Sequence, residues 1–300
     1  MSKPSAPLQR AIPRPYRARA IWRGCRWAVD MRPWNGRTQS GSLMCIDSET
    51  NNRGMLTGTI AAQEATVRNG GRFVSANGGG AAGTGLKWDD NQVNAVPQFG
   101  IYVWQNTGGM SLACTMQFRN ALPNSNRRIL TKRFGTTNNF HCGALSFNQT
   151  NGNKFEFSYC DGVGNTQSIF SSLTPSVGVT YNVVGRHWGN NALSRAELWV
   201  NGKMEALNAA PATYPAYKKD PPILFFNDTG SGDLTLDGEA SMGGLWARPL
   251  TTAEIQALNV NPYLLWGPPT APQGLPFAGP AGGLIGCNCC PGWLCNWNDM

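Results

Sequence analysis

The stretch from Ala196 to Trp266 constrains the fold more than any other part of the chain. It begins with AELWVNGKMEAL and ends with GGLWARPLTTAEIQALNVNPYLLW. Leu198, Trp199 and Val200 are residues that favour a strand, and Asn201-Gly202 supplies the two positive-φ positions that a tight hairpin turn requires. We therefore expect a β-hairpin here.

A single short helix is predicted near the end of the same stretch. Thr251 stands at the N-cap position and Glu254 follows three residues later, which is the pattern of a capping box. Leu250 and Ile255 are spaced to form a hydrophobic staple. The helix must end by Asn261, because the proline that follows has no amide hydrogen and disfavours a helical conformation in its predecessor.

The rest of the chain reads as a series of short strands between Gly, Asn and Pro clusters. In one run Phe155, Phe157 and Tyr159 alternate with Glu156 and Ser158, the period of a strand that is covered on one face. Regularly spaced strands of this kind indicate a sandwich or a barrel. The expected strands are Gly100–Trp104, Ser111–Phe118, Arg128–Arg133, His141–Phe147, Lys154–Tyr159, Thr180–Trp188 and Pro222–Phe226.

The order LWVNG, GGLWARPL and TTAEIQALNVNPYLLW resembles the C-terminal half of laminin-G-like, or concanavalin A-like, jelly-roll domains, above all those of bacteriophage and prophage proteins. The resemblance implies an all-β fold, a two-sheet antiparallel jelly-roll sandwich with one short C-terminal helix and extended terminal arms. We expect a basic, Pro- and Arg-rich arm over residues 1–39, the jelly roll over 40–266 and a Pro/Gly-rich, Cys-containing tail over 267–300.

The positive charge of the chain is concentrated in its first residues. Residues 1–37 hold nine Lys or Arg and one acid, a balance equal to the net charge of +8 of the whole chain. Clustered arginines can neutralise nucleic-acid phosphates, but the interspersed prolines favour an extended segment that docks on an acidic protein surface. We favour docking over nucleic acid. The expected docking residues are Arg14, Tyr16, Arg17, Arg19, Trp22, Arg23 and Trp27.

Two further groups of residues are candidate binding or cross-linking sites. Asp228 and Asp233 lie in the loop FFNDTGSGD, where carboxylate oxygens can hold calcium, although an ordinary Asn- and Gly-rich turn explains the same residues. Apart from calcium, we expect no cofactor. Four cysteines in the tail can form disulfide or intersubunit bonds, bind a metal or pack as free thiols: Cys287, Cys289, Cys290 and Cys295.

Catalytic carboxylates of the laminarinase-like kind are missing from the sequence. Related glycoside hydrolases carry Glu-x-Asp-x-x-Glu on one strand, whereas the nearest acids here, Asp237 and Glu239, lack a third partner. We therefore predict that the chain is not an enzyme.

These observations lead to one leading functional hypothesis and two alternatives. There is no apolar run of membrane-spanning length and no secretion signal, so we expect no membrane association. We expect a virion structural protein of a bacteriophage, assembled in the host cytoplasm. It would decorate the capsid or form a head fibre, as a homo-oligomer whose arms contact the major capsid protein or tail and neck subunits. The alternatives are a tail-fibre adhesin that binds receptor or environmental glycans and, third, a glycoside hydrolase.

Overall fold

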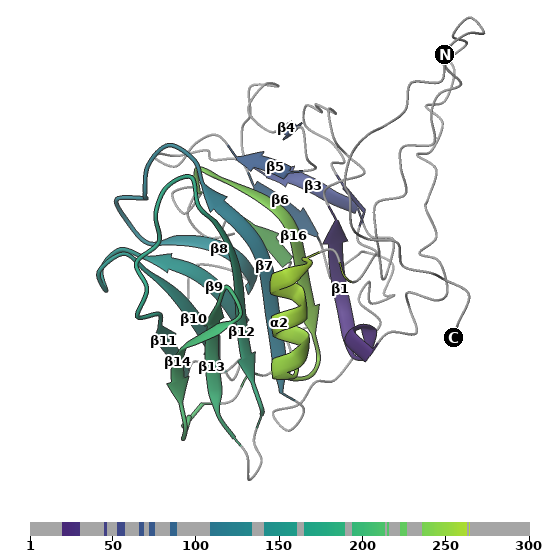
Figure 1. Cartoon of the computed structure of the whole chain (residues 1–300), viewed down its shortest axis with the longest axis vertical. Helices are drawn as coiled ribbons and strands as arrows, with labels where there is room; N and C mark the ends of the chain where they lie inside the picture. The colour runs from purple at the N-terminus through teal and green to yellow at the C-terminus, as the bar shows by residue number, and fades with distance from the viewer. Residues whose placement is uncertain are drawn as a thin grey trace, which may run out of the picture. The chain divides into compact units, whose positions relative to one another are not determined.

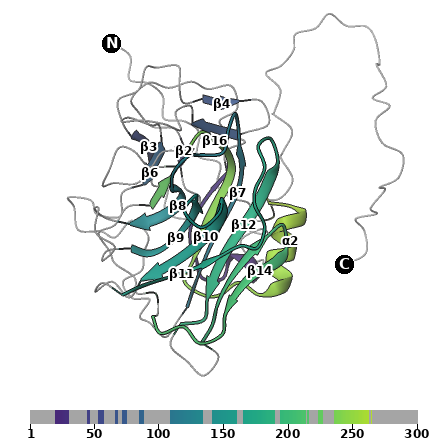
Figure 2. The same cartoon turned by 90° about the vertical axis from the view of Figure 1, so that its left-hand side faces the viewer.

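We describe the protein from a computed structural model (Figures 1 and 2). All described residues belong to one compact unit, residues 1–268, whereas residues 269–300 form a second unit that lies outside the described residues. The structure describes residues 20–30, 45–46, 53–57, 66–68, 72–75, 85–88, 109–133, 141–160, 165–189, 194–213, 215, 223–226, 236–262 and 264.

The described residues form an all-β sandwich of two antiparallel sheets with one short α-helix, which confirms the predicted fold class. The predicted terminal arms lie largely outside these residues. The first sheet has the order β14-β13-β12-β7-β16-β5-β4, and β1 also pairs with β16. Its strands are β1 (Cys25–Asp30), β4 (Thr66–Arg68), β5 (Arg72–Ser75), β7 (Met110–Phe118), β12 (Thr180–His187), β13 (Ala196–Val200), β14 (Lys203–Asn208) and β16 (Gly238–Trp246).

The second sheet has the order β11-β10-β9-β8-β15-β6-β3-β2. Four of its strands, β8, β9, β10 and β15, were expected at nearly these positions, whereas Gly100–Trp104 lies outside the described residues. Its strands are β2 (Cys45–Ile46), β3 (Arg53–Thr57), β6 (Gly85–Trp88), β8 (Arg127–Arg133), β9 (His141–Asn148), β10 (Lys154–Cys160), β11 (Thr166–Phe170) and β15 (Ile223–Phe225).

An apolar core fills the space between the two sheets. Alternate residues of β7, β9, β10, β12 and β13 point inward, as the period of a half-covered strand requires. Aromatic rings dominate the centre: the rings of Phe118 and Phe147 lie 5.3 Å apart and those of Phe155 and Tyr181 lie 5.1 Å apart, both edge to face.

The predicted hairpin and helix are both confirmed. Asn201 and Gly202 have φ values of 50° and 74°, which is the left-handed geometry of a tight turn between β13 and β14. The helix α2 spans Thr252–Val260 with Thr251 as its N-cap, and Glu254 completes the capping box. In Figure 1, α2 lies across β7 and β16 on the outer face of the first sheet. None of the described helices is long and apolar enough to cross a membrane.

Residues 20–30, which were expected to belong to the N-terminal arm, are part of the sandwich. A short 3-10 helix, η1 (Ala20–Trp22), leads into β1, and β1 pairs antiparallel with β16 over Cys25–Asp30. Trp27 was expected at a docking surface, but its side chain is fully buried in the core of its own chain. The reason is the alternation of CRWAVD, which turns Trp27 toward the core and Ala28 toward the cluster under α2.

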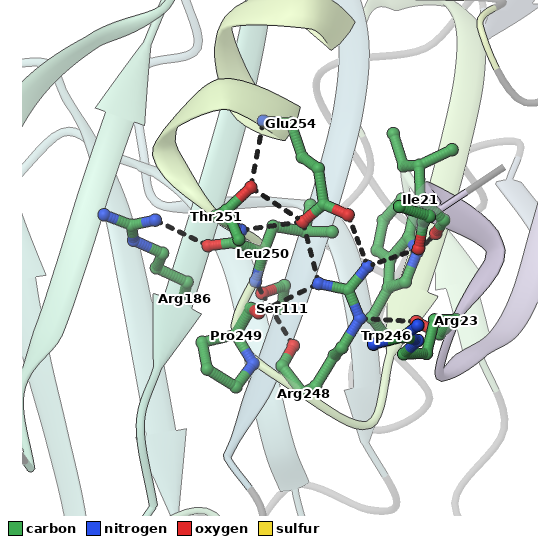
Figure 3. A network of polar contacts seen from close by, with 11 residues as sticks. Ile21, Arg23, Ser111, Arg186, Trp246, Arg248, Pro249, Leu250, Thr251 and Glu254 are labelled. Atoms are coloured by element: carbon green, nitrogen blue, oxygen red, sulfur yellow. Dashed lines mark hydrogen bonds and ion pairs between the residues drawn. The ribbon is translucent and has the colours of Figure 1, made fainter.

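A polar network fastens this N-terminal segment to the start of α2 (Figure 3). The Arg248 guanidinium donates to the backbone oxygens of Ala20, at 3.0 Å, and Arg23, and it forms an ion pair with Glu254 at 2.6 Å. The Trp246 indole donates to the Ile21 oxygen at 2.7 Å. Because Glu254 is also the capping-box residue, one carboxylate orders both the helix start and the arginine that holds η1.

A buried ion pair between β12 and β13 also connects the start of α2 to the first sheet. Arg186 on β12 and Glu197 on β13 lie 2.6 Å apart, and Arg186 Nη1 donates to the Leu250 oxygen at 2.5 Å. The guanidinium lies 4.4 Å from the ring centroid of Trp188 and 4.9 Å from that of Trp199. Buried charges are tolerated only when they are paired and hydrogen-bonded in this way. The cluster therefore fixes the position of the residue before the helix cap (Figure 3).

Candidate functional site

The outer face of the second sheet is polar along β8, β9, β10 and β11. Phe155 and Phe157 of β10 point into the core, so Glu156 and Ser158 point outward. The register places Glu156 opposite Ser146 of β9, while Ser158 faces Ser168 of β11. We call this surface the polar face; its residues are Arg128, Thr131, Ser146, Asn148, Glu156, Ser158 and Ser168.

Hydrogen bonds hold the Glu156 carboxylate in one orientation at the centre of the polar face. Ser168 Oγ donates to Oε1 at 2.6 Å and Asn148 Nδ2 donates to Oε2 at 3.0 Å. The Asn148 amide is itself fixed, because its oxygen accepts from the Asn151 amide at 2.9 Å. A carboxylate accepts about four hydrogen bonds. Acceptor positions beyond the two that Ser168 and Asn148 use suit a ligand that brings hydroxyl or N–H donors.

A bulge in β8 brings two further polar side chains to the same face. Arg128 pairs with Ser146 and Thr131 pairs with Ala144, although residues three apart in a regular strand point to opposite sides. The register shift between Arg128 and Leu130 inserts Ile129, which lies in the core beside Leu130. Arg128 Nη1 donates to Ser146 Oγ at 2.8 Å. The bulge therefore places a guanidinium and a second hydroxyl on the polar face.

The Thr131 hydroxyl is the one polar group of this face that points to a missing partner. Thr131 is fully buried, and its Oγ1 has no hydrogen-bond partner in the described structure. An unsatisfied buried hydroxyl costs roughly 1–3 kcal/mol, and such groups in native proteins are few. Ser146, Asn148, Glu156 and Ser158 of the same face are buried as well.

An aromatic ring borders the polar face. Phe170 of β11 pairs with Glu156 across the β10–β11 ladder, so it lies on the same side of the sheet, and it is half-buried. Polar groups held beside an aromatic edge can bind a molecule that has both hydroxyl groups and an apolar C–H face.

Most of the site residues predicted from the sequence lie outside the described residues. These are the calcium candidates Asp228 and Asp233, the four tail cysteines and the arm residues Arg14, Tyr16, Arg17 and Arg19, while of Trp22 only the backbone is described. Arg23 is exposed.

No cluster of metal-ligating side chains occurs within the described part of the chain. It contains no group of three His, Cys, Asp or Glu side chains that could hold a metal ion. Cys25, Cys114 and Cys160 are buried. Burial raises the pKa of the Cys114 thiol well above its usual value, so this residue is an inert core side chain.

The acids considered for catalysis do not meet the polar face. Asp237 forms an ion pair with Arg119 at 3.6 Å and accepts from Asn120 at 2.7 Å. Glu239 lies on β16 of the first sheet, opposite Gln117 of β7. The residues that sequence reasoning missed are those of the polar face, because only the strand register brings them together.

The comparisons with known proteins give a fold and no family. No family model matches the sequence, and no curated protein matches it. A sialidase from Trypanosoma rangeli in complex with sialic acid matches with a TM-score of 0.53 at 15% identity, over 82% of this chain and 34% of that chain. The receptor-binding domain of botulinum neurotoxin C/D mosaic serotype matches with a TM-score of 0.54 at 13% identity, over 81% of this chain and 54% of that chain.

The likeness covers only part of those proteins. The chain spans about a third of the sialidase and about half of the toxin domain. At such identities the match shows the two-sheet sandwich alone. It confirms the fold that the laminin-G-like resemblance implied, while the laminin-G-like and phage assignment stays a proposal.

The prediction that the chain is not an enzyme is wrong. It was based on the absence of one carboxylate pattern, and the solved structures that share this fold include sialidases. The missing Glu-x-Asp-x-x-Glu pattern therefore excludes one catalytic arrangement and no more. A shared fold assigns no activity to this chain either.

Proposed function

We propose that this chain is a glycan-recognition protein whose polar face binds hydroxyl groups of the sugar. The buried Thr131 hydroxyl, which is unsatisfied in the described structure, and the oriented Glu156 carboxylate lie on the same face two strands apart, and together they carry this proposal. Two further facts support it. The matched structures include a sialidase in complex with sialic acid and a receptor-binding domain, and the sequence resembles lectin-like jelly rolls.

Binding of the full chain to a printed glycan array, followed by titration calorimetry with the sugars that bind, tests this function. We expect Glu156→Gln to weaken binding about 10-fold or more, because a hydrogen bond to a charged group contributes roughly 1.5–3 kcal/mol. Glu205→Gln is the matched control: this carboxylate also accepts from a serine, Ser172, but it lies on β14 of the other sheet.

We expect Thr131→Val to weaken binding as well and to leave the fold intact, because Val keeps the shape of the side chain. An array without any hit, or sugar affinities that Glu156→Gln leaves unchanged, would remove the proposal. Unfolding curves of all three variants separate a loss of binding from a loss of fold.

We propose, as a second function, that the sandwich is displayed on a bacteriophage particle and fastened through its first residues. One observation favours it: β1 and the Arg248 network anchor residues 20–30 to the first sheet. A pulling force on the basic segment that precedes them would therefore be transmitted to β16, in the middle of that sheet. Residues 1–19 carry five Lys or Arg and no acid, which suits an acidic neighbouring surface.

Two N-terminal deletions test this second function. Removing residues 1–19 is expected to leave the midpoint of thermal unfolding unchanged. The same deletion should abolish co-sedimentation of the protein with the bacteriophage particles on which we propose it is displayed. Removing residues 1–30 takes away Trp27 and is expected to lower the midpoint by roughly 10 °C or more. If virions still carried the variant that lacks residues 1–19, attachment through the first residues would be contradicted.

A further inference from the structure

Two cysteines occupy opposite positions at one end of the β9–β10 strand pair. These strands are antiparallel neighbours in the second sheet, and their register has no shift up to Tyr159, which lies opposite Gly143 (Figure 2). Continued by one residue, the same register places Cys160, the last residue of β10, opposite Cys142 of β9. Only the strand pairing brings these two positions together.

The backbone spacing of an antiparallel pair matches that of a disulfide. Residues directly opposite each other have Cα atoms about 4.5 Å or about 5.5 Å apart, depending on whether the two residues exchange hydrogen bonds. A disulfide joins Cα atoms that are about 4.4–6.8 Å apart. The positions of Cys142 and Cys160 therefore meet this requirement in either kind of pair.

A bulge in β9 gives the backbone at Cys142 room to adjust. Lys132 of β8 pairs with Gly143, whereas Arg133 pairs with His141, so the register shifts and Cys142 is the extra residue. A bulged residue leaves the regular ladder and bends its strand locally. A disulfide needs Cβ atoms about 3.8 Å apart, which is closer than the roughly 4.5–5.5 Å of an ordinary cross-strand pair. The bulge allows this closer approach.

Cys160 differs from Cys25 and Cys114, the other two buried cysteines, in its surroundings. Cys114 belongs to the apolar core between the sheets, and Cys25 belongs to the apolar cluster under α2. Cys160 is fully buried but is in neither of these clusters. It follows the core residue Tyr159 and pairs with Thr166 of β11, so it lies on the outer side of the second sheet. Packing in an apolar cluster therefore explains the other two thiols and not this one.

We propose that Cys142 and Cys160 form a reversible disulfide that joins β9 to β10, with glutathione disulfide as the oxidant. The thiolate of one cysteine attacks glutathione disulfide and releases one glutathione, and the second cysteine then displaces the other. Two protein thiols are oxidised to one S–S bond, while glutathione disulfide is reduced to two glutathiones, which take up the two thiol protons. The bond would stay open in a reducing cytoplasm and close in oxidising surroundings.

The cysteine pair lies beside the polar face and is not part of it. Ser158 and Ala144, which pair with each other, lie two residues farther along the same strands. Formation of the bond requires no sugar. A failure of this proposal is therefore distinguishable from a failure of the glycan proposal.

Refolding of the reduced full chain from urea into glutathione disulfide tests the bond, because Cys160 is buried once the chain has folded. Trypsin separates the two cysteines: Cys142 lies in peptide 134–154 and Cys160 in peptide 155–186, with no other cysteine in either. The remaining thiols are blocked with N-ethylmaleimide in urea before digestion. Mass spectrometry should then find these two peptides linked, and dithiothreitol should separate them.

The thiol of Cys114 is the internal control of this experiment. It lies in peptide 88–119, which has no other cysteine and should carry the blocking group. If peptides 134–154 and 155–186 both carried the blocking group after refolding, or if either were linked mainly to a different cysteine peptide, the proposal would be overturned.

A second measurement follows the effect of the bond on stability. A cross-link between two positions of the chain restricts its unfolded state, so the oxidised chain should unfold at a temperature about 5–10 °C higher than the same sample after dithiothreitol. In Cys142→Ser and in Cys160→Ser, refolded in the same way, this difference should disappear. A difference that persists in either variant would assign the effect to other cysteines and contradict the proposal. Because each variant is compared with its own reduced form, a change in its basal stability does not affect the result.

Discussion

Replacing Trp27 with alanine is expected to lower the free energy of unfolding by about 3–5 kcal/mol, the usual cost of removing a buried tryptophan. The side chain is fully buried between the sheets, although the residue lies in a segment whose composition is that of an arm. Urea denaturation followed by circular dichroism measures the change. Val260→Ala is the control, because that side chain is 85% exposed and its truncation should have little effect.

The same experiment decides between two descriptions of the N-terminal segment. If residues 20–30 were free of the sandwich, Trp27→Ala would change stability no more than Val260→Ala does. A loss below about 1 kcal/mol would therefore mean that β1 is not docked on β16 in solution. Loss of the tryptophan from the core should also speed proteolysis within the first 30 residues, which gives an independent readout.

Replacing Arg186 with methionine is expected to cost about 3–5 kcal/mol, because it leaves a buried Glu197 without its main cation. Both side chains are 3% exposed. Arg195 also contacts Glu197, at 2.9 Å, but it is 47% exposed, so Arg195→Met should cost less than about 1 kcal/mol. The comparison of the two arginines by urea denaturation shows whether burial sets the size of the effect.

A double replacement separates the ion pair from its surroundings. Arg186→Met with Glu197→Met removes both charges, and we expect it to be less destabilising than Arg186→Met alone, since neither charge remains buried and unpaired. The Trp199 indole donates to Glu197 at 2.6 Å, so part of the loss should persist in the double variant. If the effects of the two replacements on the free energy of unfolding were simply additive, Arg186 and Glu197 would not be energetically coupled.

The local signals of the sequence predicted the elements that depend on local interactions. Asn201-Gly202 requires left-handed backbone, which few residues adopt easily, and Thr251 with Glu254 satisfies the free amides of a helix start. The alternation in β10 likewise predicted which side of the strand is covered. These features need no knowledge of distant strands.

The polar face could not be predicted from such local signals. Glu156 was assigned correctly to the side of β10 away from the aromatic residues, but its partners Asn148 and Ser168 come from neighbouring strands. Thr131 would have been placed on the wrong side, because the bulge at Ile129 is not visible as a break in the apolar pattern. Register is a property of strand pairs, and a single strand does not encode it.

The N-terminal strand escaped prediction for a different reason. It lies within residues 1–37, which are rich in arginine and proline, and this composition conceals the short alternation around Trp27. Its partner, β16, lies more than 200 residues away in the sequence. A strand of six residues carries little signal when nothing nearby in the chain pairs with it.

The pairing of β1 with β16 also sets the order of events during synthesis. Trp246 donates to the Ile21 oxygen across 225 residues, so the first strand has no partner until almost the whole sandwich has left the ribosome. Until then the nascent chain carries an exposed tryptophan and an unpaired strand edge. Chains released before β16 is complete should therefore aggregate, and folding should finish only after translation ends.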